Sequence, residues 1–245
     1  MRLAHLVATV IKTTPLRPAS LPGLQRRWQR HRMRRLHTKY QDATMIPRSA
    51  FLDNLWLCRR VADVAGCVIE CGVWRGGMLA AMAEMLGPDR RYYGFDSFQG
   101  LPDAKLEQDG AWTVRRLATA DRHPRGRLEA AQADAEATLR RSGPPVVHLV
   151  KGWFADTLPG FRPPSPVAVL RVDADLYEST WQCLDAFYPH VPAGGLILFD
   201  DYYSGWDGCP RAVHAYFALH QFAERIRESP AGVAYVIKGS REHIR

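Results

Sequence analysis

From about residue 50 onward, short apolar runs alternate with segments whose apolar residues recur at helical spacing. The apolar runs have the length of strands and lie at residues 67–73, 91–97, 146–150, 167–173, 195–201 and 233–239. Helices are expected at residues 75–86, 127–141, 177–188 and 209–223. Continuous apolar strands separated by helices predict an α/β fold, with a mostly parallel sheet covered by helices on both faces. The last strand follows the short segment 224–229 and is expected to form an antiparallel hairpin at the sheet edge.

Acidic residues directly follow two of these strands, in LRVDADLYES (170–179) and LILFDDYY (196–203). Burying an unpaired carboxylate is costly, so a positive charge is expected between the acids. Magnesium prefers carboxylate oxygens, which makes Asp173, Asp200 and Asp201 candidate metal ligands. If the strand continues, Asp175 points the same way as Asp173 and is a candidate general base. The alternative is that one or two of these acids only cap the next helix.

A glycine-rich turn, ECGVWRGG (70–77), follows the first strand. Its glycines do not have the GxGxxG spacing, which disfavours a dinucleotide site. A turn that opens with Glu70 suits a ligand with a cationic end, such as the amino group and sulfonium of S-adenosylmethionine. Asp96 ends the next strand, where it is placed to accept hydrogen bonds from a ribose diol. The alternative is a tight turn whose glycines serve close packing.

Five ordered motifs resemble the macrocin O-methyltransferase family, whose members methylate sugar hydroxyls of macrolide and aminocoumarin antibiotics. The motifs are VIECGVWRGG, FDSFQGLP, GWFADTLP, VLRVDADLYEST and GGLILFDDYY, and the resemblance spans residues 45–239. It implies a class I methyltransferase fold (Rossmann-like), S-adenosylmethionine as the methyl donor, and a divalent cation, usually Mg²⁺. Residues 103–130 and the basic N-terminus depart from the antibiotic-tailoring members, and in the family these regions help to enclose the acceptor.

The resemblance assigns roles that agree with the reading of the residues. It makes Asp173, Asp200 and Asp201 the metal ligands and Asp175 the base. The expected donor-binding residues lie at the ends of four strands: Glu70, Gly72, Trp74, Arg75, Gly76, Asp96, Ser97, Gly152, Trp153 and Asp173. The loop 202–209, YYSGWDGC, is expected to form a wall for the acceptor, because its aromatic rings suit the face of a sugar.

The charge of the chain is unevenly distributed. The formal net charge is +8, yet residues 1–40 hold ten Lys or Arg and no acid, and the rest of the chain holds 23 basic and 25 acidic residues. We therefore expect a basic N-terminal extension over residues 1–44, acting as an arm or lid, and a methyltransferase domain over residues 45–245 that folds without residues 1–40. The run LQRRWQRHRMRRLHTKY (24–40) predicts an arm against a second subunit, a helix on an anionic surface, or a solvated tail.

Three further expectations concern partners and location. We expect a small-molecule hydroxyl acceptor and a homo-oligomer, with neither a nucleic-acid partner nor membrane attachment. Five cysteines without metal-ligand spacing favour a reducing, cytoplasmic setting. Two alternatives to a sugar O-methyltransferase stay open: a catechol-type metal-dependent methyltransferase, and a non-catalytic nucleotide- or metal-binding module held at an anionic surface.

Overall fold

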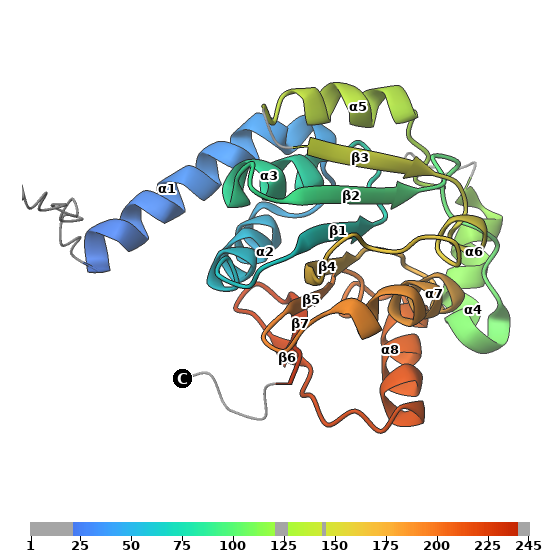
Figure 1. Ribbon diagram of the computed structural model, residues 1–245. Coiled ribbons are helices and arrows are strands. Elements are labelled where there is room, and N and C mark those ends of the chain that lie inside the picture. The colour runs from blue at the N-terminus through green and yellow to red at the C-terminus, as the bar shows by residue number, and fades with distance from the viewer. Residues whose placement is uncertain (1–21, 121–126, 144–145, 240–245) are drawn as a thin grey trace, which may run out of the picture.

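One mixed sheet forms the centre of the molecule (Figure 1). The computed structural model describes residues 22–120, 127–143 and 146–239. Within them the seven strands are ordered β3-β2-β1-β4-β5-β7-β6. The strands are β1 (Cys67–Cys71), β2 (Arg91–Asp96), β3 (Val146–Lys151), β4 (Val167–Val172), β5 (Leu196–Phe199), β6 (Arg227–Glu228) and β7 (Ala234–Ile237). The first five are parallel, and β7 runs antiparallel to both β5 and β6.

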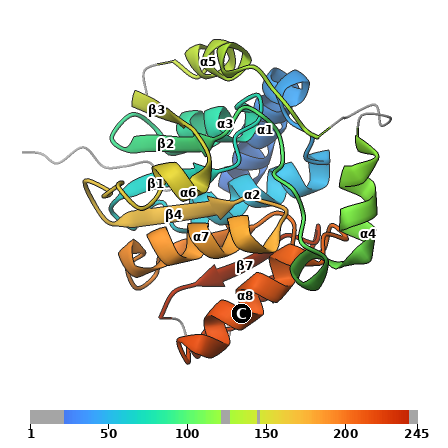
Figure 2. The same ribbon diagram turned by 90° about the vertical axis from the view of Figure 1, so that its right-hand side faces the viewer.

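Helices cover both faces of this sheet (Figure 2). They are α1 (Pro22–Tyr40), η1 (Gln41–Ala43), α2 (Arg48–Arg60), α3 (Gly77–Leu86), α4 (Leu106–Ala118), α5 (Gln132–Arg140), α6 (Phe154–Thr157), α7 (Tyr177–Phe187), η3 (Tyr188–His190) and α8 (Gly208–Leu219). Helices α1, α2, α3 and α5 pack on one face, and α6, α7 and α8 on the other. Helix α4 lies beyond the carboxyl ends of the parallel strands.

The fold class and the edge hairpin are confirmed, and all six expected strands are present within a few residues of their expected bounds. The apolar pattern did not predict α2, α4, α6 or the short edge strand β6. The predicted ends of two strands, at residues 173 and 201, lie too far along the chain. Strand β4 ends at Val172 and β5 at Phe199, before the acids. The acids that follow therefore lie in loops, where the backbone is free to turn.

The sheet divides the core into two layers because successive side chains of a strand point to opposite faces. On β4, Val169 faces the layer formed by α1–α3, whereas Leu170 and Val172 face the layer formed by α7 and α8. Arg171 shares the face of Val169 and is fully buried. A charged side chain thus lies inside the core on the α2 and α3 side of the sheet.

The second half of helix α1 packs against the domain. Met33, Leu36 and Tyr40 are buried in the core shared with α2 and α3. The Tyr40 hydroxyl donates to Glu84 on α3 at 2.8 Å, and Lys39 forms an ion pair with the same carboxylate at 2.5 Å. The domain boundary at residue 44 stays a prediction, but the end of the proposed extension contributes apolar surface to the core. None of the helices in the described ranges is long and apolar enough to cross a membrane.

Candidate functional site

Two adjoining cavities lie at the carboxyl edge of the sheet, near the point where the strand order reverses. Strand β1 is followed by β2 on one side, while β4 and β5 lie on the other, and ligands bind in such crevices of open α/β sheets. The cavities measure about 310 and 230 Å³. Both are lined by Met45, Gly72, Trp74, Asp173 and Asp175.

Seven of the ten expected donor-binding residues line the larger cavity: Gly72, Trp74, Asp96, Ser97, Gly152, Trp153 and Asp173. Glu70 lines only the smaller cavity, together with Asp200 and Asp201. Arg75 points elsewhere, because its guanidinium lies 4.7 Å from the ring centre of Trp74 and 3.7 Å from Asp134. Gly76 lines neither cavity and caps the N-terminus of α3 in a left-handed conformation.

The glycine-rich turn is pressed against the end of β4. Gly72 has φ of 88°, and a Cβ there would lie 1.7 Å from the carbonyl oxygen of Asp173, so this position requires glycine. Gly77 is similarly close to the segment before α2, since its Cβ would lie 2.4 Å from the carbonyl oxygen of Ala43. These contacts bring residues 43–47 to the rim of the smaller cavity, opposite Glu70.

Asp96 holds this turn in place. Its Oδ2 accepts hydrogen bonds from the backbone N–H groups of Val73 and Trp74 at 2.7 and 2.8 Å, and its Oδ1 accepts one from Phe98 at 2.7 Å. A carboxylate has about four acceptor positions, so about one remains for a ribose hydroxyl. The side chain of Ser97 is also engaged locally, donating to Gly100 and accepting from Gln99, both at 3.0 Å. Ribose binding by Asp96 stays a prediction.

A buried arginine lies among the acids, and the sequence reasoning missed it. Arg171 Nη1 forms ion pairs with Glu70 at 2.7 Å and Asp173 at 2.8 Å, and Nη2 pairs with Asp200. Glu70 and Arg171 are register partners on β1 and β4. The expected positive charge between the acids is therefore supplied, in part, by the protein itself. An arginine in an otherwise apolar strand, directly before two acids, was the available signal.

Burial shapes the electrostatics of this network. It raises the pKa of Glu70 to about 8, against the opposing effect of Arg171. Burial and the neighbouring Asp200 raise the pKa of Asp173 to about 6. Burial alone would lower the pKa of Arg171, but the three carboxylates raise it well above its ordinary value. Arg171 therefore stays charged, and Glu70 and Asp173 hold protons more readily than exposed carboxylates do.

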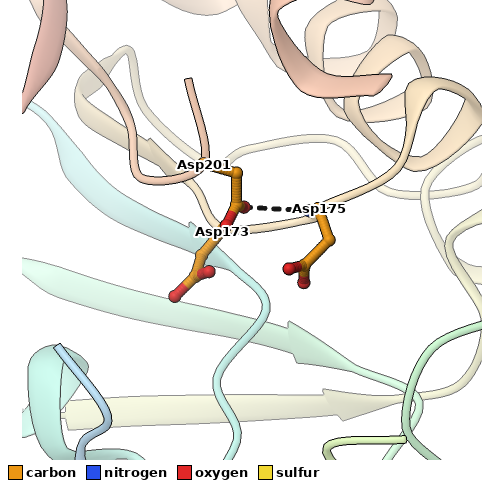
Figure 3. A group of neighbouring side chains, drawn as sticks. All are labelled: Asp173, Asp175 and Asp201. Atoms are coloured by element: carbon orange, nitrogen blue, oxygen red, sulfur yellow. Dashed lines mark hydrogen bonds between the residues drawn. The ribbon is translucent and has the colours of Figure 1, made fainter. Parts of the chain in front are cut away.

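Three carboxylates come together beside this network (Figure 3). Oxygen atoms of Asp173, Asp175 and Asp201 all lie within 4.8 Å of one another. The expectation of extended backbone through Asp175 is wrong, because Asp175 has φ of 55°, in the left-handed region. Its N–H donates to Asp201 Oδ2 at 2.9 Å, which fixes the turn. The turn brings Asp175 into the carboxylate group, while Asp200 is directed to Arg171.

The residues present fit a divalent cation. The smaller cavity is lined by five carboxylates, those of Glu70, Asp173, Asp175, Asp200 and Asp201, and by two guanidinium groups, those of Arg116 and Arg171. Burial and neighbouring carboxylates raise the pKa of both Asp175 and Asp201 well above the ordinary value, and Arg116 opposes this at Asp175. Carboxylates this close together repel one another unless they bind protons or a cation. Hard oxygen donors suit Mg²⁺.

The outer wall of the smaller cavity comes from α4 and the loop after β5. Trp206 and Ser204 of that loop line the cavity, as does Arg116 of α4. The expectation that residues 202–209 form an acceptor wall is consistent with this position. Helix α4 lies in the segment 103–130 that departs from the antibiotic-tailoring members of the resembled family.

Comparisons with known proteins identify the family of the chain. The family model described as Macrocin-O-methyltransferase matches residues 10–235. A Streptomyces olivaceus protein, 8-demethyl-8-(2,3-dimethoxy-alpha-L-rhamnosyl)-tetracenomycin-C 4'-O-methyltransferase, is 36% identical over 186 residues, which are 72% of this chain and 69% of that protein. Demethyldecarbamoylnovobiocin O-methyltransferase from Streptomyces niveus is 37% identical over 67% of this chain and 63% of its own length. The solved structure of the O-methyltransferase NovP has a TM-score of 0.68 at 31% identity, covering 80% of this chain and 81% of that one.

Proposed function

The chain belongs to the macrocin O-methyltransferase family, and from this premise we propose that it methylates a hydroxyl of a sugar or glycosylated small molecule with the help of a divalent cation. It is an enzyme, an S-adenosylmethionine-dependent O-methyltransferase. One observation carries the proposal: the acidic cluster of Asp173, Asp175 and Asp201 adjoins the cavity lined by the expected donor residues. The tetracenomycin relative is named for O-methyl transfer to a compound that carries a rhamnosyl group, which supports the acceptor class.

The chemistry divides between the two cavities. The donor would occupy the larger one, against Gly72, Asp96 and Trp153. Asp173, Asp201 and Asp200 would hold the cation, with Asp200 shared with Arg171. When bound, a divalent cation lowers the pKa of a coordinated hydroxyl by several units.

Asp175 is the candidate base in this arrangement. Its raised pKa makes it a stronger base once ionised, and its position within the carboxylate group brings it near the acceptor oxygen. Asp175 would accept the proton of the acceptor hydroxyl as that oxygen takes the methyl group from the sulfonium sulfur, with S-adenosylhomocysteine as the leaving group.

The experiment compares Asp173→Asn and Asp201→Asn with Asp156→Asn, an exposed control on α6. The first two variants are expected to lose methyl transfer and Mn²⁺ binding by calorimetry, while binding of S-adenosylhomocysteine should survive in Asp201→Asn, whose side chain does not line the larger cavity. The control should match the wild-type protein in all three measurements. Undiminished methyl transfer in excess EDTA would rule out the metal-dependent mechanism.

The choice of acceptor decides between the remaining alternatives. Mass-shift screening against sugars, glycosides and catechols separates the sugar reading from a catechol-type methyltransferase. Family membership argues against a non-catalytic binding module. The homo-oligomeric state, the arm role of the N-terminus and a cytoplasmic location stay predictions, and light scattering tests the first of them.

A further inference from the structure

Arg116, which lines the smaller cavity, lies beside a pair of tryptophans that contact each other. Its guanidinium carbon is 5.8 Å from the ring centre of Trp112 and 5.4 Å from that of Trp206. The two indole rings meet edge to face, with centres 5.5 Å apart. Trp112 precedes Arg116 by one helical turn of α4, whereas Trp206 belongs to the loop after β5. Contacts from two separate elements therefore hold the guanidinium at this place.

The charge of Arg116 acts on Asp175, but none of the close ion pairs in the described ranges involves Arg116. It nevertheless lines the same cavity as Asp173, Asp175 and Asp201. An arginine offers five N–H donors in a planar fork and no acceptor. Arg116 therefore presents hydrogen-bond donors to whatever enters the cavity, on the wall that α4 forms.

Helix α4 is anchored, so the position of Arg116 is a defined part of the site. Asp109 is 2% exposed, and its carboxylate accepts hydrogen bonds from the backbone N–H groups of Lys105 and Tyr177, both at 2.7 Å. The second of these bonds ties α4 to the first residue of α7. Gly110 then breaks the helix with φ of 79°, which sets the direction of the turns that carry Trp112 and Arg116.

We propose that Arg116 binds an oxygen atom of the acceptor ring other than the hydroxyls that face the acidic cluster. This inference rests on the proposed function and deepens it. An acceptor whose neighbouring hydroxyls meet Asp173 and Asp201 would present its next ring oxygen toward the α4 wall. A sugar carries such an oxygen, and a catechol does not. Arg116 thereby selects a polyhydroxylated saturated ring, and Trp206 supplies an apolar surface beside it.

The experiment uses three small probes that all present two adjacent hydroxyls: methyl α-L-rhamnopyranoside, trans-1,2-cyclohexanediol and catechol. Only the rhamnoside adds a further ring hydroxyl. Binding is measured by saturation-transfer NMR titration with Mg²⁺ and S-adenosylhomocysteine present. The variants are Arg116→Gln and the control Arg115→Gln, whose side chain is exposed and lines neither cavity. Melting temperature and S-adenosylhomocysteine affinity establish that each variant is folded.

Loss of a charge-assisted hydrogen bond is expected to weaken binding of the rhamnoside to Arg116→Gln by about tenfold or more. Binding of cyclohexanediol and catechol should stay as in the wild-type protein, and Arg115→Gln should bind all three probes normally. Equal rhamnoside affinity in the wild-type and Arg116→Gln proteins, or an equal loss for all three probes, would overturn the proposed role of Arg116 and leave the proposed function standing. If no probe binds the wild-type protein in a Mg²⁺-dependent way, the proposed function fails with it.

Discussion

Replacing Arg171 with methionine removes the guanidinium that pairs with one buried carboxylate, Glu70, and with two partly buried ones, Asp173 and Asp200. Arg171 is 0% exposed and pairs with Glu70, Asp173 and Asp200. Methionine fills much of the same space but cannot neutralise them. Removing one partner of a buried ion pair typically costs about 3–5 kcal/mol. For a chain of 245 residues, this predicts a fall in melting temperature of roughly 6–20 °C at pH 8 in EDTA.

The pH dependence of the lower melting temperature distinguishes the effect of the lost charge from the effect of altered packing. Lowering the pH protonates Glu70 and Asp173, whose pKa values are raised to about 8 and 6, so the melting temperature of Arg171→Met should lie closer to that of the wild-type protein at pH 5.5 than at pH 8. Adding Glu70→Gln to Arg171→Met should recover part of the loss at pH 8. The control is Arg140→Met, whose side chain is 71% exposed and which should change stability by less than about 0.5 kcal/mol. Thermal melts followed by circular dichroism measure all four proteins. An Arg171→Met protein that melts within about 2 °C of the wild-type protein at pH 8 would refute the reasoning.

Three further predictions concern the site and the N-terminus. In EDTA, the free energy of unfolding of the wild-type protein should fall as pH rises from about 4.5 to 8, because Glu70 and Asp173, whose pKa values are raised to about 8 and 6, keep protons in the folded state that the unfolded chain has released. Urea titrations across this range, with and without Mg²⁺, check this, and a profile that rises with pH would contradict it. Asp96→Ala should weaken S-adenosylhomocysteine binding by about 1–3 kcal/mol, measured by calorimetry, and an unchanged dissociation constant would place the ribose elsewhere. Deleting residues 1–40 should lower the free energy of unfolding by about 5 kcal/mol or more through loss of Met33, Leu36 and Tyr40 from the core. Deleting only residues 1–21 serves as its control, and equal stability of the two truncated proteins would restore the sequence-based expectation that residues 1–40 are dispensable.

The strands themselves and the edge of the sheet that carries the site could be predicted because both depend on local pattern. Apolar runs and the acids after them are visible in the sequence, and parallel strands bring their carboxyl ends to one edge. The pairing of Asp200 with Arg171 could not be predicted, because it depends on the neighbouring places of β4 and β5 in the sheet. The left-handed turn at Asp175 could not be predicted from residue type, because Asp adopts positive φ more often than most residues but still at only a small share of positions.

The packing of α1 into the core was also missed, although the signal was present in the sequence. Met33, Leu36 and Tyr40 recur at helical spacing, but they are scattered through a run of arginines, and the charge drew attention away from the apolar stripe. The core contribution of this segment was therefore visible in the sequence. Whether the helix also contacts a second subunit depends on surfaces beyond one chain.

The close contact between Gly72 and the Asp173 backbone has a consequence for how such an enzyme changes its acceptor over evolution. Strands β1 and β4 are direct neighbours, so the donor turn and the acidic cluster are separated by about one interstrand spacing, near 4.8 Å. The distance from donor to acceptor is then set largely by main-chain hydrogen bonding. Substitutions in α4 and residues 202–207 alter the rim without moving this frame. New acceptors are accessible through changes in surface loops, while the reacting groups keep their alignment.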